Sequence, residues 1–125
     1  MSEKKAAFRV SIPDGKGYVL TVLNEPMTRA MTVEYLEEIK QRGKELSNPR
    51  FLFDARGAPN VRGTMGDYEI YDFAMSFGFP GARIAVIVDP EDRSYDFTDT
   101  VACNAGYQHR LFTREEEAIS WLDTP

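Results

Sequence analysis

Two short apolar runs constrain the fold of this 125-residue chain more than any other feature. They are Phe51 to Phe53 and Ile84 to Val88, and neither shows the polar alternation that is typical of a half-exposed strand. A strand that is apolar on both faces must be covered on both sides, as central parallel strands are. The sequence therefore predicts a sheet with helices packed on its two faces.

An antiparallel hairpin is expected before these strands. Apolar residues at 8, 10 and 12 alternate with polar ones, and the segment 13–17 is rich in turn-forming proline, aspartate and glycine. Tyr18 to Leu23 then reads as the return strand.

A long helix follows the hairpin. Thr28 or Thr32 is its expected N-cap, and Asn48-Pro49 is its expected stop, because proline disfavours helical continuation. Its predicted buried stripe follows helical spacing and consists of Val33, Leu36, Ile39, Gly43 and Leu46.

Three further helices are expected. Thr64 opens the second, which Gly78 ends, and the third runs from Phe97 to Ala105. The last strand, Tyr107 to Phe112, precedes a fourth helix, for which Thr113 and Glu116 have the spacing of a capping box.

These elements predict one α/β domain over residues 1–125. Its sheet is mixed and open, with about five strands: the N-terminal hairpin first, then strands joined by parallel crossovers, flanked by about four helices. A length of 125 residues and a hydrophobic content of 42% suit one buried core.

Three segments carry a resemblance to a known family: residues 51–57 (FLFDARG), 83–89 (RIAVIVD) and 110–122 (RLFTREEEAISWL). On these segments the chain resembles the SpoIIAA-like family of the STAS superfamily, which is related to the anti-sigma-factor antagonists. The resemblance implies a mixed sheet flanked by helices. It also implies no cofactor, usually no catalysis, and action through protein contacts or a bound small molecule.

The resemblance also draws attention to Thr64. Anti-sigma-factor antagonists carry a phosphorylated serine at a helix N-terminus, and Thr64 falls near that position, although Gly63 replaces the preceding acidic residue. Exposed N–H groups around Gly63, Thr64 and Gly66 suit an anion or a phospho-acceptor site. The alternative is that Thr64 acts only as an N-cap.

Charge and composition exclude several classes of function. The net charge of -5 argues against nucleic acids and acidic membranes as partners. The single cysteine, Cys103, excludes an internal disulfide, and no apolar run approaches the roughly 20 residues of a membrane span. A cytoplasmic location is expected.

Candidate catalytic residues are few. Asp54 and Asp89 follow the two central strands, where open α/β sheets bind ligands, but the chain lacks the acidic pair and the lysine of a receiver-type magnesium site. We expect no metal and no cofactor. Cys103 and His109 are not spaced as an obvious nucleophilic pair, and His109 is expected to pack on a strand face with Tyr107 and Leu111.

The predicted second helix carries two apolar faces, and a single sheet can cover only one of them. Three coverings of the second face are open: Tyr95 and Phe97 of the same chain, a protein partner or second copy, or a small apolar ligand. The residues assigned to partner or ligand binding on this face are Tyr68, Tyr71, Met75 and Phe79.

The expected function is a non-enzymatic regulatory or protein-interaction module of STAS-like type. A carrier or sensor of a small apolar ligand is the first alternative. An enzyme with a carboxylate site at the strand ends is the second.

Overall fold

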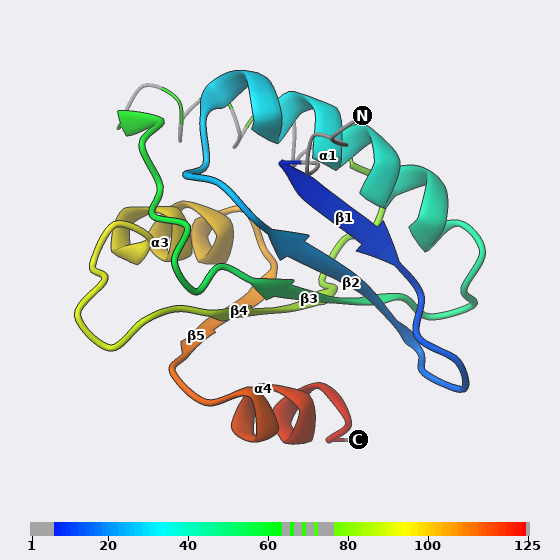
Figure 1. Cartoon of the computed structure of the whole chain (residues 1–125). Coiled ribbons are helices and arrows are strands. Elements are labelled where there is room, and N and C mark those ends of the chain that lie inside the picture. Colours follow the sequence, from blue (N-terminus) through cyan, green and yellow to red (C-terminus); the bar gives the residue numbers. More distant parts are fainter. Residues whose placement is uncertain (1–6, 64–65, 67–68, 70–71, 73–76, 125) are drawn as a thin grey trace, which may run out of the picture.

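A five-stranded mixed sheet organises the chain (Figure 1). The structure is a computed structural model that describes residues 7–63, 66, 69, 72 and 77–124. The strands lie side by side in chain order. β1 and β2 are antiparallel and all other neighbours are parallel, as the sequence predicts. They are β1 (Phe8–Ser11), β2 (Tyr18–Leu23), β3 (Arg50–Asp54), β4 (Arg83–Ile87) and β5 (Gln108–Phe112).

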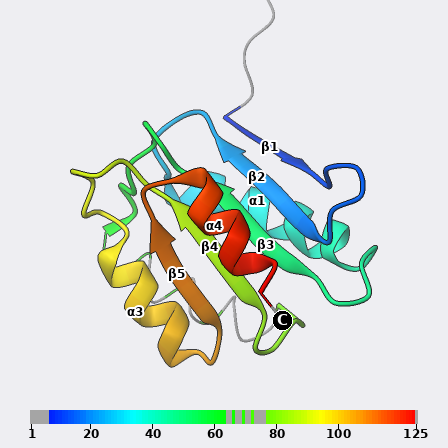
Figure 2. The same ribbon diagram turned by 90° about the horizontal axis from the view of Figure 1, so that it is seen from below.

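Helices cover both faces of the sheet. The described residues contain α1 (Arg29–Gly43) and α3 (Asp96–Asn104) on one face and α4 (Glu115–Leu122) on the other (Figures 1 and 2). They are three helices, one fewer than predicted, because most of the expected second helix lies outside the described residues. The positions Gly66, Glu69 and Asp72 within it are helical, and Glu69 accepts a hydrogen bond from Nε of Arg29 in α1 at 2.5 Å.

The covering of both faces follows from the two apolar runs. Along β3, Phe51 and Phe53 point toward α1 and α3, whereas Leu52 points toward α4. The same division separates Val86 from Ile87 in β4, so each central strand contributes to two cores. The prediction that these strands are central and parallel is confirmed.

The buried stripe of α1 differs from the prediction. Thr28 is the N-cap, and its hydroxyl accepts a hydrogen bond from the backbone N–H of Met31 at 3.2 Å. Tyr35 is only 3% exposed, whereas Val33, predicted to be buried, is 43% exposed. The ring of Tyr35 packs edge-on against Phe53 of β3, with 5.8 Å between ring centroids, and this aromatic contact sets the rotation of the helix.

The ends of two helices were also predicted wrongly. α1 ends at Gly43, before Asn48-Pro49, and the chain turns there through a hydrogen bond from Leu46 N to Gly43 O at 3.1 Å. α4 has Arg114 as its N-cap, with no side-chain cap bond, so the Thr113–Glu116 capping box is not formed. The guanidinium of Arg114 instead donates to the carboxylate of Glu116 at 2.9 Å.

Candidate functional site

A cavity of about 100 Å³ lies between the sheet and the helices α1 and α3. Its walls are mainly aliphatic and aromatic side chains from both helices and from β3 and β4. They include Leu36, Ile39, Phe51, Phe53, Ile84, Val86 and Ala102. A pocket with this lining favours an apolar ligand or an apolar part of a larger one.

Arg62 joins the two helices that border the cavity. Its guanidinium donates from Nη1 to the hydroxyl of Thr32 in α1 at 3.1 Å, and from Nη2 to the hydroxyl of Thr98 in α3, also at 3.1 Å. Because it bonds to both helices, Arg62 fixes their separation at this edge of the cavity.

Hydrogen bonds to α3 and to the segment before it also hold the loop that precedes Arg62. The side-chain amide of Asn60 donates to the hydroxyl of Thr98 at 3.1 Å and to the carbonyl oxygen of Ser94 at 3.2 Å. Tyr95 is 2% exposed, lines the cavity, and donates its hydroxyl to the carbonyl oxygen of Ala58 at 2.6 Å. Of the two side chains proposed as an internal cover, Tyr95 is therefore buried, whereas Phe97 remains 38% exposed.

His109 is the second polar group with a fixed position in the cavity wall. Its side chain is 5% exposed, and its Nδ1 lies 2.8 Å from a carboxylate oxygen of Asp99 in α3. The ring shares a sheet face with Tyr107 and Leu111, as predicted. The same environment raises the pKa of the Tyr107 hydroxyl, because burial disfavours the charged phenolate.

Cys103 and His109 do not form a nucleophilic pair. The thiol of Cys103 donates to the backbone carbonyl oxygen of His109 at 3.4 Å, whereas the ring is engaged by Asp99. A general base must reach the nucleophile with a ring nitrogen, and here only the main chain meets the sulfur.

Asp54 and Asp89, the carboxylates at the strand ends, form hydrogen bonds with the turn that follows β3. Arg56 donates to both carboxylate oxygens of Asp54, at 2.9 and 2.8 Å, and these bonds hold the pKa of Asp54 below its usual value. Asp89 accepts a hydrogen bond from the backbone N–H of Gly57 at 2.7 Å. Both side chains thus order the loop after β3.

Asp54 and His109 lie apart. Asp54 pairs with Ile87 in the sheet register and His109 with Ile84, so about three residue steps, on the order of 10 Å, separate them along the strands. They also face opposite sides of the sheet: Arg56, the partner of Asp54, reaches Glu115 of α4, whereas His109 contacts α3. Among the described residues, no group of three or more histidine, cysteine, aspartate or glutamate side chains is placed to hold a metal ion.

The sequence-predicted partner site is described only at Phe79. Tyr68, Tyr71 and Met75 lie outside the described residues, and so does Thr64 of the candidate anion site. Phe79 is half-buried and packs on Phe51 and Phe77, with centroid distances of 5.4 and 5.0 Å. It contributes to the core beneath α1.

The two flanking glycines of the candidate anion site are described. Gly63 has a φ of 78°, in the left-handed region that favours glycine. Gly66 is buried, and a Cβ there would meet Cβ of Arg62 at 2.7 Å. A requirement for close packing against Arg62 accounts for the glycine at position 66.

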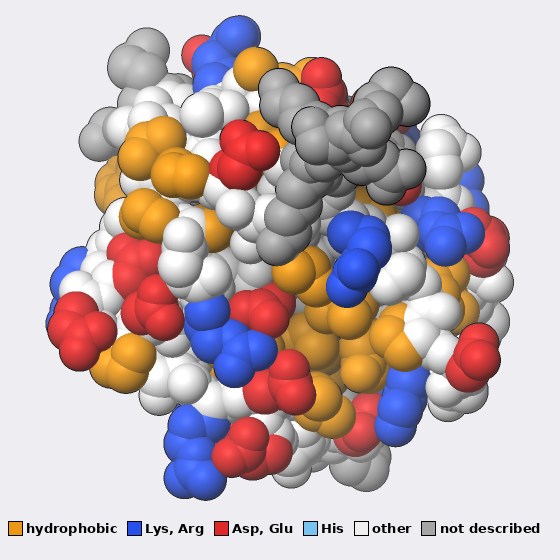
Figure 3. Space-filling view, viewed as in Figure 1, with side chains coloured by type: hydrophobic (Ala, Val, Ile, Leu, Met, Phe, Trp, Pro, Cys, Tyr) orange, Lys and Arg blue, Asp and Glu red, His pale blue; other side chains and the backbone are white. Residues whose placement is uncertain are grey.

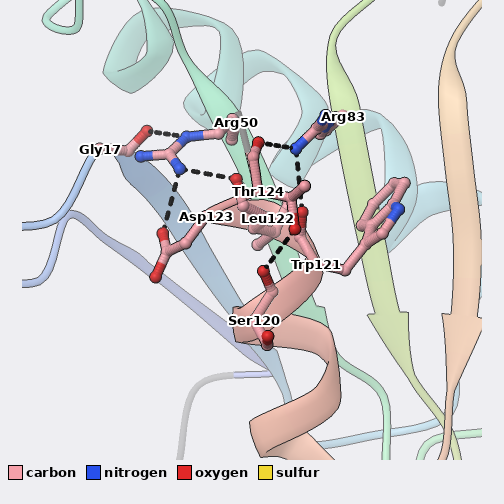
Figure 4. A network of polar contacts seen from close by, with 8 residues as sticks. All are labelled: Gly17, Arg50, Arg83, Ser120, Trp121, Leu122, Asp123 and Thr124. Atoms are coloured by element: carbon pink, nitrogen blue, oxygen red, sulfur yellow. Dashed lines mark hydrogen bonds and ion pairs between the residues drawn. The ribbon is translucent and has the colours of Figure 1, made fainter.

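A polar hollow of about 550 Å³ lies at the amino ends of β3 and β4. Figure 4 shows the hydrogen bonds that Arg50 and Arg83 make beside it with the end of α4. Arg50 donates to the carbonyl oxygen of Leu122 at 2.7 Å and to the carboxylate of Asp123 at 3.1 Å. Arg83 donates to the carbonyl oxygen of Trp121 at 3.0 Å. These cations satisfy the last carbonyl groups of α4 and oppose its dipole, so their role is structural.

Acidic and basic side chains are interspersed on the face shown in Figure 3, and the described residues form no extended basic area there. This arrangement agrees with the net charge of -5. Within the described part of the chain, no helix has both the length and the apolar character that a bilayer span requires.

Sequence reasoning missed Arg62 and Asp99, the residues that hold the polar groups of the cavity. Neither stands in a recognisable motif, and a charged residue beside a predicted helix usually faces water. The contact of Asp99 with His109 depends on α3 lying against the strand that carries His109, and the sequence holds no signal for that contact. Comparisons with protein-family models, with curated proteins and with solved structures give no match.

Proposed function

We propose that this chain is a non-enzymatic binding module of STAS-like type, which holds a small apolar ligand in the cavity beneath α1 and α3. The observation that supports this proposal is the combination of an apolar lining with two polar groups, Arg62 and His109, that hydrogen bonds hold in place. Ligand sites commonly pair apolar walls with a few fixed polar groups. The family resemblance, which implies action through contacts or a bound small molecule, points the same way.

The size of the cavity limits the ligand. An engineered cavity of about 150 Å³ accepts benzene, so about 100 Å³ corresponds to roughly four or five non-hydrogen atoms. The ligand is therefore a short branched molecule, or a larger one that inserts only one end.

The positions of the candidate catalytic groups favour binding over chemistry. Asp54 faces α4 and His109 faces α3, and the thiol of Cys103 meets only a backbone carbonyl group. Groups that act on one substrate must reach it directly or through one water molecule. Asp54, His109 and Cys103 therefore cannot act together on one substrate.

Protein contact is the second candidate function. Val61 and Phe97 are exposed apolar residues, 57% and 38%, on two segments that the Asn60–Thr98 hydrogen bond joins. Exposed apolar residues on adjoining segments favour a partner surface. Light scattering tests this candidate with the double variant Val61→Ser, Phe97→Ser. An oligomeric wild type and a lower mass for the double variant support the candidate. A monomeric wild type that captures no partner rules it out.

Ala102→Leu tests the ligand-binding proposal, because Ala102 lines the cavity and a larger side chain there fills it. Ala30→Leu is the matched control, since Ala30 is an exposed residue of α1. We expect freshly purified wild type and Ala30→Leu to carry a small-molecule adduct in native mass spectrometry, or to bind 2-methylbutane in solution. Ala102→Leu should do neither.

The binding is measured by methyl NMR, with the signals of Ile84 and Val86 as reporters of the cavity. The proposal is wrong if the wild type has no adduct and these methyl signals stay unchanged in 2-methylbutane. It is also wrong if Ala102→Leu binds the probe as well as the wild type does.

A further inference from the structure

We infer that the cavity prefers a ligand with a hydroxyl group, which donates its hydrogen to Nε2 of His109. This inference rests on the proposed function and specifies the ligand class. The chemistry it predicts is that of a small aliphatic alcohol, or of a larger alcohol whose hydroxylated end enters the cavity.

The hydrogen bond between Nδ1 and Asp99 determines which ring nitrogen of a neutral His109 can accept a further hydrogen bond. An ionised carboxylate has only acceptor atoms, so the 2.8 Å contact requires a hydrogen on Nδ1. In the neutral ring, Nε2 then carries a lone pair and can only accept. A carboxylate partner fixes the histidine tautomer in the same way at metal sites.

The other polar groups of the lining already have partners within the protein. The hydroxyl of Tyr95 donates to Ala58, and the hydroxyl of Thr98 accepts from both Asn60 and Arg62. For Nε2 of His109, the part of the chain that the structure describes offers no polar partner. His109 is thus the lining residue whose hydrogen-bonding capacity the described protein leaves unused.

Nε2 of His109 is a hydrogen-bond acceptor on a side chain that is 5% exposed, so a ligand hydroxyl that enters the cavity can add a hydrogen bond there. A hydrocarbon or an ether cannot, because neither has a hydrogen to donate. The apolar walls of Ile84, Val86 and Ala102 then favour a hydrocarbon remainder over a second polar group.

The experiment compares isobutanol with 2-methylbutane, which differ by a hydroxyl in place of a methyl group. His109 is the only histidine, so its two imidazole nitrogens give unambiguous ¹⁵N signals. We expect both compounds to shift the methyl signals of Ile84 and Val86. Only isobutanol should shift the Nε2 signal in the direction of hydrogen-bond acceptance.

Variants supply an affinity readout. His109→Leu should weaken isobutanol binding by about threefold to tenfold and leave 2-methylbutane within about twofold, as expected for one neutral hydrogen bond. Asp99 is a positioning residue, so Asp99→Ala should redistribute the ring hydrogen between Nδ1 and Nε2 in the ligand-free protein. If His109→Leu does not fold, the ¹⁵N titration of the wild type decides alone.

The outcomes separate this inference from the proposed function. If neither compound shifts the cavity methyl signals, the proposed function fails and the inference fails with it. If both compounds shift those signals but the Nε2 signal stays fixed in isobutanol, the cavity binds apolar ligands without using His109, and only the inference is overturned. If both compounds shift the methyl signals and only isobutanol shifts the Nε2 signal, both the proposed function and the inference are supported.

Discussion

The guanidinium of Arg50, in the first residue of β3, donates from Nη1 to the main-chain oxygen of Leu122 at 2.7 Å, across 72 positions of sequence. We predict that Arg50→Met lowers the free energy of unfolding by about 1–2 kcal/mol. The variant leaves carbonyl groups at the end of α4 without the charged hydrogen-bond donor that they have in the wild type. Urea denaturation measures the change.

Arg42→Met is the control for that variant. Arg42 forms an exposed pair with Glu45 within one turn, and such pairs contribute only about 0.3–0.5 kcal/mol. If Arg50→Met and Arg42→Met lower the free energy of unfolding equally, the contact between β3 and the end of α4 stabilises the fold no more than an exposed ion pair does.

Thr21 and Thr32 are both buried, at 1% and 0% exposure, but their hydroxyl groups differ. The hydroxyl of Thr32 donates to Thr28 O at 2.8 Å and accepts from Arg62, whereas that of Thr21 has no partner in the described structure. We predict that Thr21→Val raises the free energy of unfolding by up to about 1 kcal/mol, and that Thr32→Val lowers it by about 1–2 kcal/mol. Thermal or urea unfolding of the two variants should therefore give shifts of opposite sign; shifts of the same sign contradict the prediction.

The sheet could be predicted because its signals are local. The apolar run around Leu52 and the similar run around Val86 each specify a strand, and the turn between β1 and β2 specifies the hairpin. The sheet order agrees with the tendency of consecutive strands to lie next to one another. The rotation of α1 about its axis was harder to predict. Val33 and Tyr35 are both acceptable core residues, and the choice depends on aromatic contacts with residues far away in the sequence.

The candidate site was harder to predict for the same reason. The position of Arg62 depends on two threonines, on different helices, that it joins only in the folded chain. The pairing of His109 with Asp99 requires α3 to lie against β5, which residue spacing alone does not indicate. Sequence analysis identified His109 as a packed strand residue, but its orientation by Asp99 is a tertiary property.

Asp54 should make stability depend on pH in the acid range. Hydrogen bonds from Arg56 lower the pKa of the Asp54 carboxyl group in the folded state. The unfolded chain therefore binds a proton at this carboxyl group at higher pH than the folded chain does. The resulting stabilisation is present above the unfolded pKa and is lost as pH falls, from about pH 5 downward. Asp54→Asn should therefore flatten the pH dependence of urea midpoints below about pH 5. Asp14→Asn, in the exposed turn between β1 and β2, is the control and should retain the wild-type slope.

Gly43, the last residue of α1, tests whether Phe79 belongs to the core or to a partner surface. Alanine at this position gains up to about 1 kcal/mol in helix propensity over glycine. However, its Cβ would lie 2.8 Å from Cζ and 3.0 Å from Cε2 of the Phe79 ring, which packs on Phe51 and Phe77, and overpacking of this kind costs about 1–3 kcal/mol. We predict a net loss of about 1 kcal/mol in Gly43→Ala, measured by urea denaturation. The loss should shrink in a Phe79→Leu background, because the smaller side chain leaves room for the new methyl group. If Gly43→Ala is instead stabilising in the wild-type background, the ring of Phe79 turns away at little cost and is available to a partner, as the sequence interpretation expected.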